Sequence, residues 1–175
     1  SPIAAVLCAP GTNRDSDVSF ALTQAGATPI SYLMADLISH PSRIDDADII
    51  VIAGGFSYAD ALGAGRLFAV ELENSIGDRI GAAIAERRPV IGICNGFQTL
   101  VRMGILPEDN GLVALGHNDG GVFDCRWIEM EPVSKKCIWT RNLTENIHCP
   151  IAHGEGRLTA GSSTVSDLLK NDQVA

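Results

Sequence analysis

The chain has 175 residues, of which 46% are hydrophobic and 19% charged, and its formal net charge is −8. This length and composition fit one globular domain with a buried core, and they exclude a disordered chain. The acidic balance, without a cluster of Lys or Arg, disfavours nucleic-acid binding, and the longest apolar runs are as short as strands, which excludes a membrane span.

Cysteine usage indicates the redox environment. Five cysteines, at positions 8, 94, 125, 137 and 149, form no C-x-x-C pair. A secreted disulfide framework favours an even count in a shorter chain, so we expect reduced thiols and a cytoplasmic protein. No group of His and Cys has zinc spacing, so no metal is predicted.

The first 104 residues alternate between short apolar runs and helical patterns. We predict strands at 3–8, 28–34, 49–53 and 90–94, and helices at 15–25, at about 67–86 and from 95 onward. The runs at 49–53 and 90–94 are read as buried strands; the first, IIVIA, is continuous and β-branched, as in a strand covered on both faces. Such alternation implies a parallel sheet with helices on both faces.

The pattern changes after residue 104. Apolar and charged side chains alternate from residue 123, which indicates a half-exposed strand over 123–131. Further short strands of antiparallel type are predicted near 136–140 and 147–152, and a short helix over 164–170 capped by Ser163 or Thr164.

The segment Gly92-Ile93-Cys94-Asn95-Gly96 joins a predicted strand to a predicted helix. This is the pattern of a nucleophile elbow with Cys in place of Ser. The sharp turn exposes the central side chain, and flanking glycines let the backbone pass without Cβ clashes. The helix N-terminus favours a thiolate, and its N–H groups can bind an oxyanion. The alternative is a buried cysteine before a Gly-rich turn, but the flanking strand and helix favour the nucleophile.

A second segment, AGGFSYAD at 53–60, also follows a buried strand directly. In an open α/β sheet, ligands lie beyond the carboxyl ends of the strands, and both this segment and Cys94 fall there. The paired Gly54 and Gly55 allow backbone N–H groups to point into a site as a second oxyanion donor. Taken alone, the segment would be read as a plain turn.

A third segment, PIAHGEGR at 150–157, brings polar side chains together between glycines. His153 and Glu155 are two residues apart, so on a strand they would share a face. A thiol nucleophile needs a base, and an imidazole oriented by a carboxylate can supply one. A structural polar turn is the alternative. The Gly-rich stretch at 116–121 follows no clear βα unit and is not read as a dinucleotide loop.

Together, AGGFSYAD, GICNGFQ and PIAHGEGR resemble the glutaminase component of phosphoribosylformylglycinamidine synthase, a class I glutamine amidotransferase. The opening CAPGTNRDSD and the stretch HNDGGVFDCRWIEM resemble the same family, so the likeness covers the chain as one domain, 1–175. It implies a flavodoxin-like, three-layer α/β fold with a central, mostly parallel sheet and a more antiparallel C-terminal part.

The resemblance also implies an activity, the hydrolysis of glutamine to glutamate and ammonia. Cys94 would form a glutamyl thioester, N–H groups around Gly55, Phe56 and Asn95 would form the oxyanion hole, and Gln98 would help to shape the glutamine pocket. Ammonia would pass to a separate synthetase subunit that uses ATP and Mg²⁺ to make the amidine of formylglycinamide ribonucleotide. A small accessory subunit is a further implied partner, and the chain itself would need no cofactor.

One departure from the family concerns the catalytic base. The family carries its catalytic His and Glu in a later His-Pro-Glu segment, which is absent from the sequence ending at Ala175. Three interpretations stay open, in this order: a truncated active enzyme, a short enzyme that uses His153 and Glu155 instead, or an inactive module that docks on the synthetase. In the family, PIAHGEGR lies close to the glutamine site, so both residues are also candidates for substrate binding.

Two further points bear on this assignment. The family usually has Gly at the position of Ala59, so a methyl group there would strain a turn that favours positive φ. Outside the family, a flavodoxin-like cysteine hydrolase or redox sensor would explain the Cys94 elbow equally well. That alternative leaves the other two segments unexplained.

Overall fold

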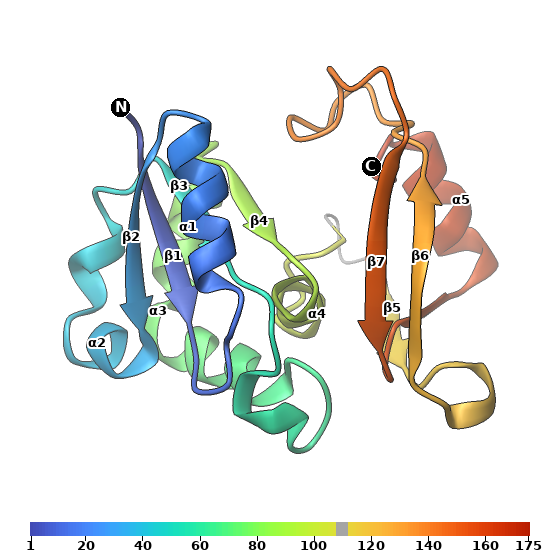
Figure 1. Ribbon diagram of the computed structural model, residues 1–175, viewed down its shortest axis with the longest axis horizontal. Coiled ribbons are helices and arrows are strands. Elements are labelled where there is room, and N and C mark those ends of the chain that lie inside the picture. The colour runs from blue at the N-terminus through green and yellow to red at the C-terminus, as the bar shows by residue number, and fades with distance from the viewer. Residues whose placement is uncertain (108–111) are drawn as a thin grey trace. The chain divides into compact units, whose positions relative to one another are not determined.

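A computed structural model describes residues 1–107 and 112–175. The chain divides into two compact units, Ser1–Met103 and Gly104–Ala175. Figure 1 shows the helices and strands of both units, and each unit is described here by itself.

The first unit is built on a parallel four-stranded sheet with the strand order β2-β1-β3-β4. Its elements are β1 (Ile3–Cys8), α1 (Asp15–Gln24), β2 (Thr28–Leu33), α2 (Met34–Ser39), η1 (Pro41–Ile44), β3 (Ile49–Ile52), η2 (Ser57–Asp60), α3 (Arg66–Ala85), β4 (Val90–Gly92) and α4 (Asn95–Arg102). The predicted alternation of strand and helix is confirmed, and so is the parallel sheet. The short helix α2 was not predicted.

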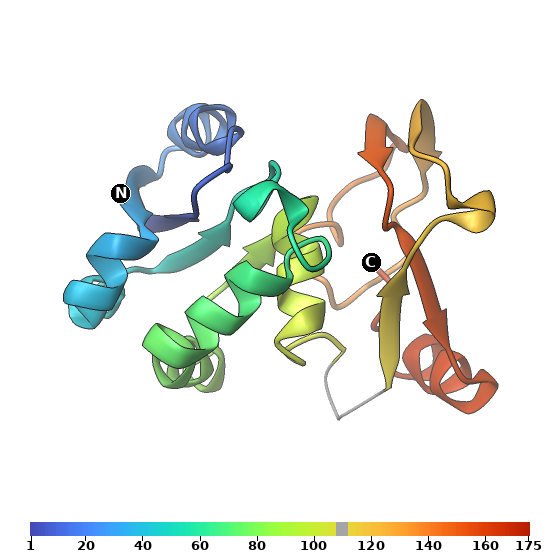
Figure 2. The ribbon, with the colours of Figure 1, turned by 90° about the horizontal axis from the view of Figure 1, so that it is seen from below.

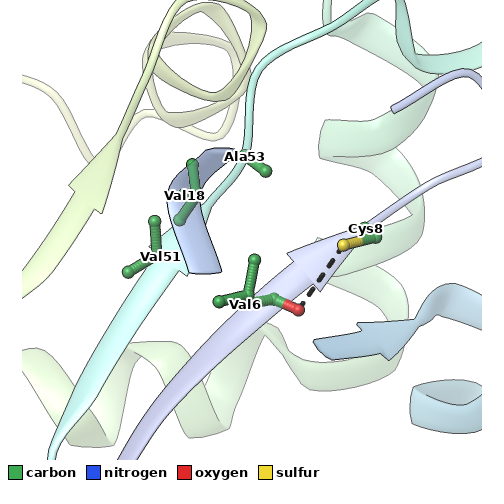
Figure 3. Close-up of a cluster of buried hydrophobic side chains, with 5 residues drawn as sticks. All are labelled: Val6, Cys8, Val18, Val51 and Ala53. Carbon is green, nitrogen blue, oxygen red and sulfur yellow. Dashed lines mark hydrogen bonds between the residues drawn. The ribbon is translucent and has the colours of Figure 1, made fainter. Parts of the chain in front are cut away.

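Helices cover both faces of this sheet, because its central strands are apolar on both sides. Figure 2 shows α1 on one face and α2 and α3 on the other. Beneath α1, buried side chains of α1, β1, β3 and the residue after β3 form the cluster of Figure 3: Val6, Cys8, Val18, Val51 and Ala53. On the opposite face, α3 buries an apolar stripe at helical spacing, made of Phe68, Leu72, Ile76 and Ile80.

The buried Cys8 is a structural thiol. Its Sγ lies 3.6 Å from the carbonyl oxygen of Val6, which accepts a weak hydrogen bond (Figure 3). Burial, and then the charge of Asp15, raise the pKa of Cys8 to about 12. A thiol held in its neutral form is a poor nucleophile, so Cys8 belongs to the core and not to the chemistry.

The strand at 90–92 differs from its prediction. It was expected to be fully buried, but β4 lies at one edge of the sheet and its residues are only partly buried. The strand also ends two residues early, at Gly92. Ile93 is 43% exposed, and the backbone then turns sharply into α4.

The second unit contains two short antiparallel ladders, β5 with β8 and β6 with β7. Its elements are β5 (Val113–Gly116), η4 (Asp119–Gly121), β6 (Asp124–Met130), β7 (Ile147–His153), β8 (Arg157–Ala160) and α5 (Ser162–Lys170). The predicted antiparallel character is confirmed, as are the strands near 123–131 and 147–152. β5 and β8 were not predicted.

Two predictions for this unit are wrong. Residues 136–140 form no strand, because local bonds satisfy their backbone: Oγ of Ser134 accepts from the N–H groups of Lys136 and Cys137. The helix α5 begins at Ser162 after Gly161, and no side chain caps it. Ser163 and Thr164 therefore lie inside the first turn and do not act as caps.

The core is concentrated in the first unit. Among the described residues of the second unit, only Leu115 and Ser134 are buried. No helix in the described part of the chain is both long and apolar enough to cross a bilayer.

Candidate active site

Cys94 occupies a sharp turn between β4 and α4. Its backbone has φ 54° and ψ −111°, a conformation that few residues with a side chain adopt. It forms the N-cap of α4, and the residue is exposed. The predicted geometry of strand, turn and helix is therefore present, and it leaves the thiol accessible beside the positive end of a helix.

Glycine is required at the two positions flanking the elbow because neighbouring backbone atoms leave no room for a Cβ, and not because φ is positive there. A Cβ on Gly92 would lie 2.4 Å from the carbonyl oxygen of Gly96, and a Cβ on Gly96 would lie 2.0 Å from that of Ile52. Neither contact is possible for a real side chain. The elbow can thus form only with glycine on both sides of the Ile93-Cys94-Asn95 segment.

The Gly54-Gly55 segment lies directly beside the elbow. A Cβ on Gly54 would lie 3.2 Å from the Cβ of Cys94. Gly55 has φ +140°, and a Cβ there would lie 2.7 Å from the backbone nitrogen of Asn13. The paired glycines therefore let the elbow at Cys94 approach on one side and the opening loop at Asn13 on the other.

The opening loop supports this segment from the other side. The N–H of Phe56 donates to the carbonyl oxygen of Gly11 at 3.1 Å, and the N–H of Arg14 donates to that of Gly54 at 3.3 Å. A β-bridge joins Thr12 to Gly55. The carboxyl ends of β1, β3 and β4 thus bring together the CAPGTNRDSD, AGGFSYAD and GICNGFQ segments, as expected for an open parallel sheet.

These bonds bear on the predicted oxyanion hole. The N–H of Asn95 is the first of α4, where N–H groups have no intrahelical acceptor. The N–H of Phe56 is engaged with Gly11, so its predicted role requires that this bond be exchanged for one to the substrate. The roles of Gly55, Phe56 and Asn95 stay predictions.

A left-handed turn follows the glycine pair. Tyr58 and Ala59 have φ of 53° and 52°, and Asp60 has φ 53°. The expected positive φ at Ala59 is thus confirmed. The hydroxyl of Tyr58 donates to Glu71 in α3; burial, then this hydrogen bond and the charge of Glu71, raise the pKa of Tyr58. The protonated phenol fastens the turn to α3.

The side chains of Asn95 and Gln98 point into the protein and are 2% and 8% exposed. Nδ2 of Asn95 donates to Oε1 of Gln98 at 3.2 Å and to Oδ1 of Asp60 at 3.0 Å. Oδ1 of Asn95 accepts from the N–H of Ser57 at 3.3 Å and from its hydroxyl. The first helical turn after the nucleophile is therefore tied to the AGGFSYAD segment.

His153 belongs to the second unit, at the end of β7, where Asn118 fixes it. Oδ1 of Asn118 accepts from the N–H of Gly156 at 3.0 Å and lies 2.9 Å from Nδ1 of His153. An amide oxygen is only an acceptor, so Nδ1 must carry the proton. The neutral imidazole then has its lone pair on Nε2, the form that a general base needs.

Glu155 lies in the bend that follows β7, so the expectation of a shared strand face with His153 is wrong. The strand stops at His153 because the chain turns there through Gly154 and Gly156. A Cβ on Gly156 would lie 2.1 Å from the His153 ring, so this glycine leaves room for the imidazole against the turn.

A cavity of about 310 Å³ adjoins His153. Its charged lining consists of two ion pairs, Arg126 with Asp124 at 3.0 Å and Arg157 with Asp119 at 2.8 Å. Among the described residues, no three His, Cys, Asp or Glu side chains gather as a metal site would require.

Sequence reasoning missed three residues that organise these sites: Ser57, Asp60 and Asn118. Ser57 and Asp60 lie inside the AGGFSYAD segment, where the sequence pointed to the glycines, Phe56 and Ala59 and not to these two side chains. Asn118 lies in the Gly-rich stretch 116–121, which was considered as a dinucleotide loop and as part of the family resemblance, with no role for its asparagine. Asn between glycines often caps turns through its side chain, and that signal pointed to Asn118.

Comparison with known proteins identifies the family. The sequence model of the CobB/CobQ-like glutamine amidotransferase domain matches residues 1–175. This chain belongs to that family. It is 49% identical to the phosphoribosylformylglycinamidine synthase subunit PurQ of Treponema denticola, over 99% of this chain and 70% of that protein. It is 38% identical to the same subunit of Dehalococcoides mccartyi, over 93% of this chain and 65% of that protein. The chain thus spans about two thirds of the length of these relatives.

Solved structures agree with the family. The chain matches a protein in the structure of PurLQS from Thermotoga maritima with a TM-score of 0.73 and 33% identity, over 92% of this chain and 70% of that one. A glutamine amidotransferase from the same organism, 14% identical with a TM-score of 0.60, shares the fold. The assignment to the glutamine amidotransferases, and among them to the PurQ kind, is confirmed, as is the α/β fold.

Proposed function

We propose that this chain is the glutaminase component of phosphoribosylformylglycinamidine synthase, acting in purine biosynthesis. The observation that carries the proposal is the elbow: Cys94 is exposed at the N-terminus of α4 with φ 54°, beside the Gly54-Gly55 segment. A nucleophile and backbone N–H donors at one helix N-terminus suit acyl transfer from an amide. The relatives' shared subunit name supplies the substrate context.

The reaction proceeds in two halves. The Cys94 thiolate attacks the side-chain amide carbon of glutamine, and the N–H groups of Asn95 and Gly55 stabilise the negative oxygen of the tetrahedral intermediate. The C–N bond breaks, the nitrogen takes up a proton, and ammonia leaves a glutamyl thioester. Water then attacks the thioester carbon, which releases glutamate and restores the thiolate. Gln98 supports the glutamine pocket from within α4.

In the second interpretation, a short enzyme that uses His153 and Glu155 in place of the family's later His-Pro-Glu segment, His153 is the candidate base. Asn118 holds its Nδ1 protonated, which leaves the lone pair that a general base needs on Nε2. Replacing His153 by Gln is expected to lower turnover by about 10²-fold or more if it is the base. If it only binds substrate together with Glu155, KM should rise and turnover should change little.

The ammonia is delivered to a synthetase subunit, which binds ATP and Mg²⁺, and a small accessory subunit completes the assembly. The solved PurLQS structure supports the expectation of such partners. The chain itself holds no cofactor in this proposal. We place it in the cytoplasm, where its five free cysteines would stay reduced.

The test uses 6-diazo-5-oxo-norleucine, a glutamine analogue that alkylates the nucleophile. We expect one adduct per chain, mapped to Cys94 and absent from Cys94→Ala, with the synthetase present or absent. Cys125→Ala is the matched control, because Cys125 is also an exposed free thiol. Labelling of Cys125 would contradict the proposal, and so would the absence of any labelling with the synthetase present. Stable binding to the synthetase without labelling would favour a docking module.

A further inference from the structure

Asn95 has a second role that its place beside the nucleophile does not reveal. Its backbone N–H is a predicted oxyanion donor, but its side chain turns inward and is buried. That side chain makes four hydrogen bonds, so every donor and acceptor of the amide is used. A fully satisfied buried amide has a fixed orientation, because any rotation would leave unpaired polar groups in the core.

The partners of this amide come from both sides of the elbow. Ser57 offers its N–H and its hydroxyl from the residue directly after Phe56, at the end of the Gly54-Gly55 segment. Gln98 lies one turn further along α4. Asp60 belongs to the left-handed turn. One side chain therefore links the segment after β3 to the helix after β4.

We propose that the Asn95 side chain is a positioning residue that holds the Gly54–Ser57 segment in register with the elbow. This inference rests on the proposed function. An oxyanion hole assembled from two loops works only if both N–H groups converge on the same oxygen, and a shift of about 1 Å costs about 10²-fold in rate. Asn95 supplies one of those groups from its backbone and fixes the other loop through its side chain.

A purely structural role is the competing explanation, and the geometry separates the two. The glycine segment is also held by the opening loop, through the bonds to Gly11 and from Arg14, which do not involve the elbow. Loss of the Asn95 amide therefore leaves the segment folded but free to shift relative to Cys94. Chemistry at Cys94 that needs no oxyanion hole should then persist.

The experiment compares Asn95→Leu with Thr99→Val, both assembled with the synthetase. Leu has the branched heavy-atom shape of Asn, with methyl groups in place of its polar atoms, so the four bonds are lost. Thr99 is equally buried in the same helix, and its hydroxyl bonds only to the carbonyl oxygen of Asn95, so it is the matched control. We measure glutamine turnover, KM, and the rate at which iodoacetamide alkylates Cys94, a reaction that involves no oxyanion.

For Asn95→Leu we expect turnover to fall by about 10²-fold, with KM and the alkylation rate within about threefold of wild type. Thr99→Val should keep turnover within about threefold. Unchanged turnover in Asn95→Leu would overturn the inference, and so would a parallel loss of turnover and alkylation, which marks a collapsed elbow. Absence of turnover in the wild type would instead refute the proposed function, and this inference with it.

Ser57→Ala keeps the test decisive if Asn95→Leu does not fold. It removes only the hydroxyl donor and leaves the Ser57 N–H bond, so a fall of about tenfold is expected, with alkylation unchanged. Where both variants fold, the double variant should be no slower than Asn95→Leu alone, because both changes remove one interaction. Multiplying effects would show that the two residues act independently.

Discussion

At the scale of single residues, the backbone of Cys94 is strained where the chemistry takes place. A side chain at φ 54° and ψ −111° costs on the order of 1–3 kcal/mol relative to a relaxed conformation. The strain is held by the close backbone contacts on either side, where Gly92 and Gly96 leave no room to relax. In return, the thiol projects from the turn at the helix N-terminus and does not pack into the core.

This strain predicts an unusual order of stability among two inactive variants. The free energy of unfolding of Cys94→Gly should exceed that of Cys94→Ala by about 1 kcal/mol, because only glycine adopts this conformation without cost. Cys94→Gly should therefore unfold at a higher urea concentration. The control is Ala83→Gly near the C-terminal end of α3, where glycine inside a helix should lose about 1 kcal/mol. Urea unfolding checks the order, and a Cys94→Ala that is the more stable of the two would show that the turn is unstrained.

The sequence could predict some of these residue properties because they follow from residue type and order. Cys between two glycines after a strand predicts the elbow, and the Ala59 departure predicts a positive φ. The engaged N–H of Phe56 and the inward Asn95 amide could not be predicted, since they depend on how separate loops meet. Asn118 carries a local turn signal, but its bonds to His153 and Gly156, 35 and 38 residues further along the chain, could not be predicted for the same reason.

At the scale of elements, glycine is needed in the turn from β4 to α4 more than in any helix. Gly96→Ala places a Cβ 2.0 Å from the backbone oxygen of Ile52, so β3 and α4 must move apart. We expect a loss of about 3 kcal/mol or more in unfolding free energy, and no labelling of Cys94 by the glutamine analogue. Gly81→Ala in α3 is the control.

Nothing lies within 4 Å of a Cβ at Gly81, so that change should stabilise the protein by about 0.5–1 kcal/mol. Urea unfolding of both variants makes the comparison. A Gly96→Ala protein that is as stable as wild type and still labelled would mean that the elbow tolerates a side chain. The close approach of β3 to α4 would then not be needed for the site.

The elements of the first unit could be predicted because each has its own local signal. β1 and β3 are continuous apolar runs, and α3 carries a long stripe at helical spacing. The second unit has weaker signals: β5 and β8 have only four residues each, and the Ser134 turn looks like a strand in its apolar content. The ladder of β5 with β8 joins residues more than 40 apart, which no local pattern encodes.

At the scale of the whole molecule, burial is divided unequally between the two units. The first unit buries both faces of its central strands β1 and β3, whereas β6 leaves the large apolar side chains of Trp127 and Met130 in solvent, 65% and 43% exposed. Trp127 packs instead against the ring of His148, with 4.9 Å between ring centroids. Such a ladder gains little from apolar burial, so its hydrogen bonds must open more readily than those of the core strands.

Hydrogen exchange measured by mass spectrometry tests this difference. We expect the amides of β1 and β3 to exchange at least about 10²-fold more slowly than those of β6 and β7, because opening the core strands exposes Val6, Val51 and their neighbours to water. Measurements at two protein concentrations control for association through the exposed side chains. Equal protection at both concentrations would contradict the prediction. Protection of β6 and β7 that grows with concentration would show instead that a second molecule covers Trp127, and that the slow exchange is a property of an assembly.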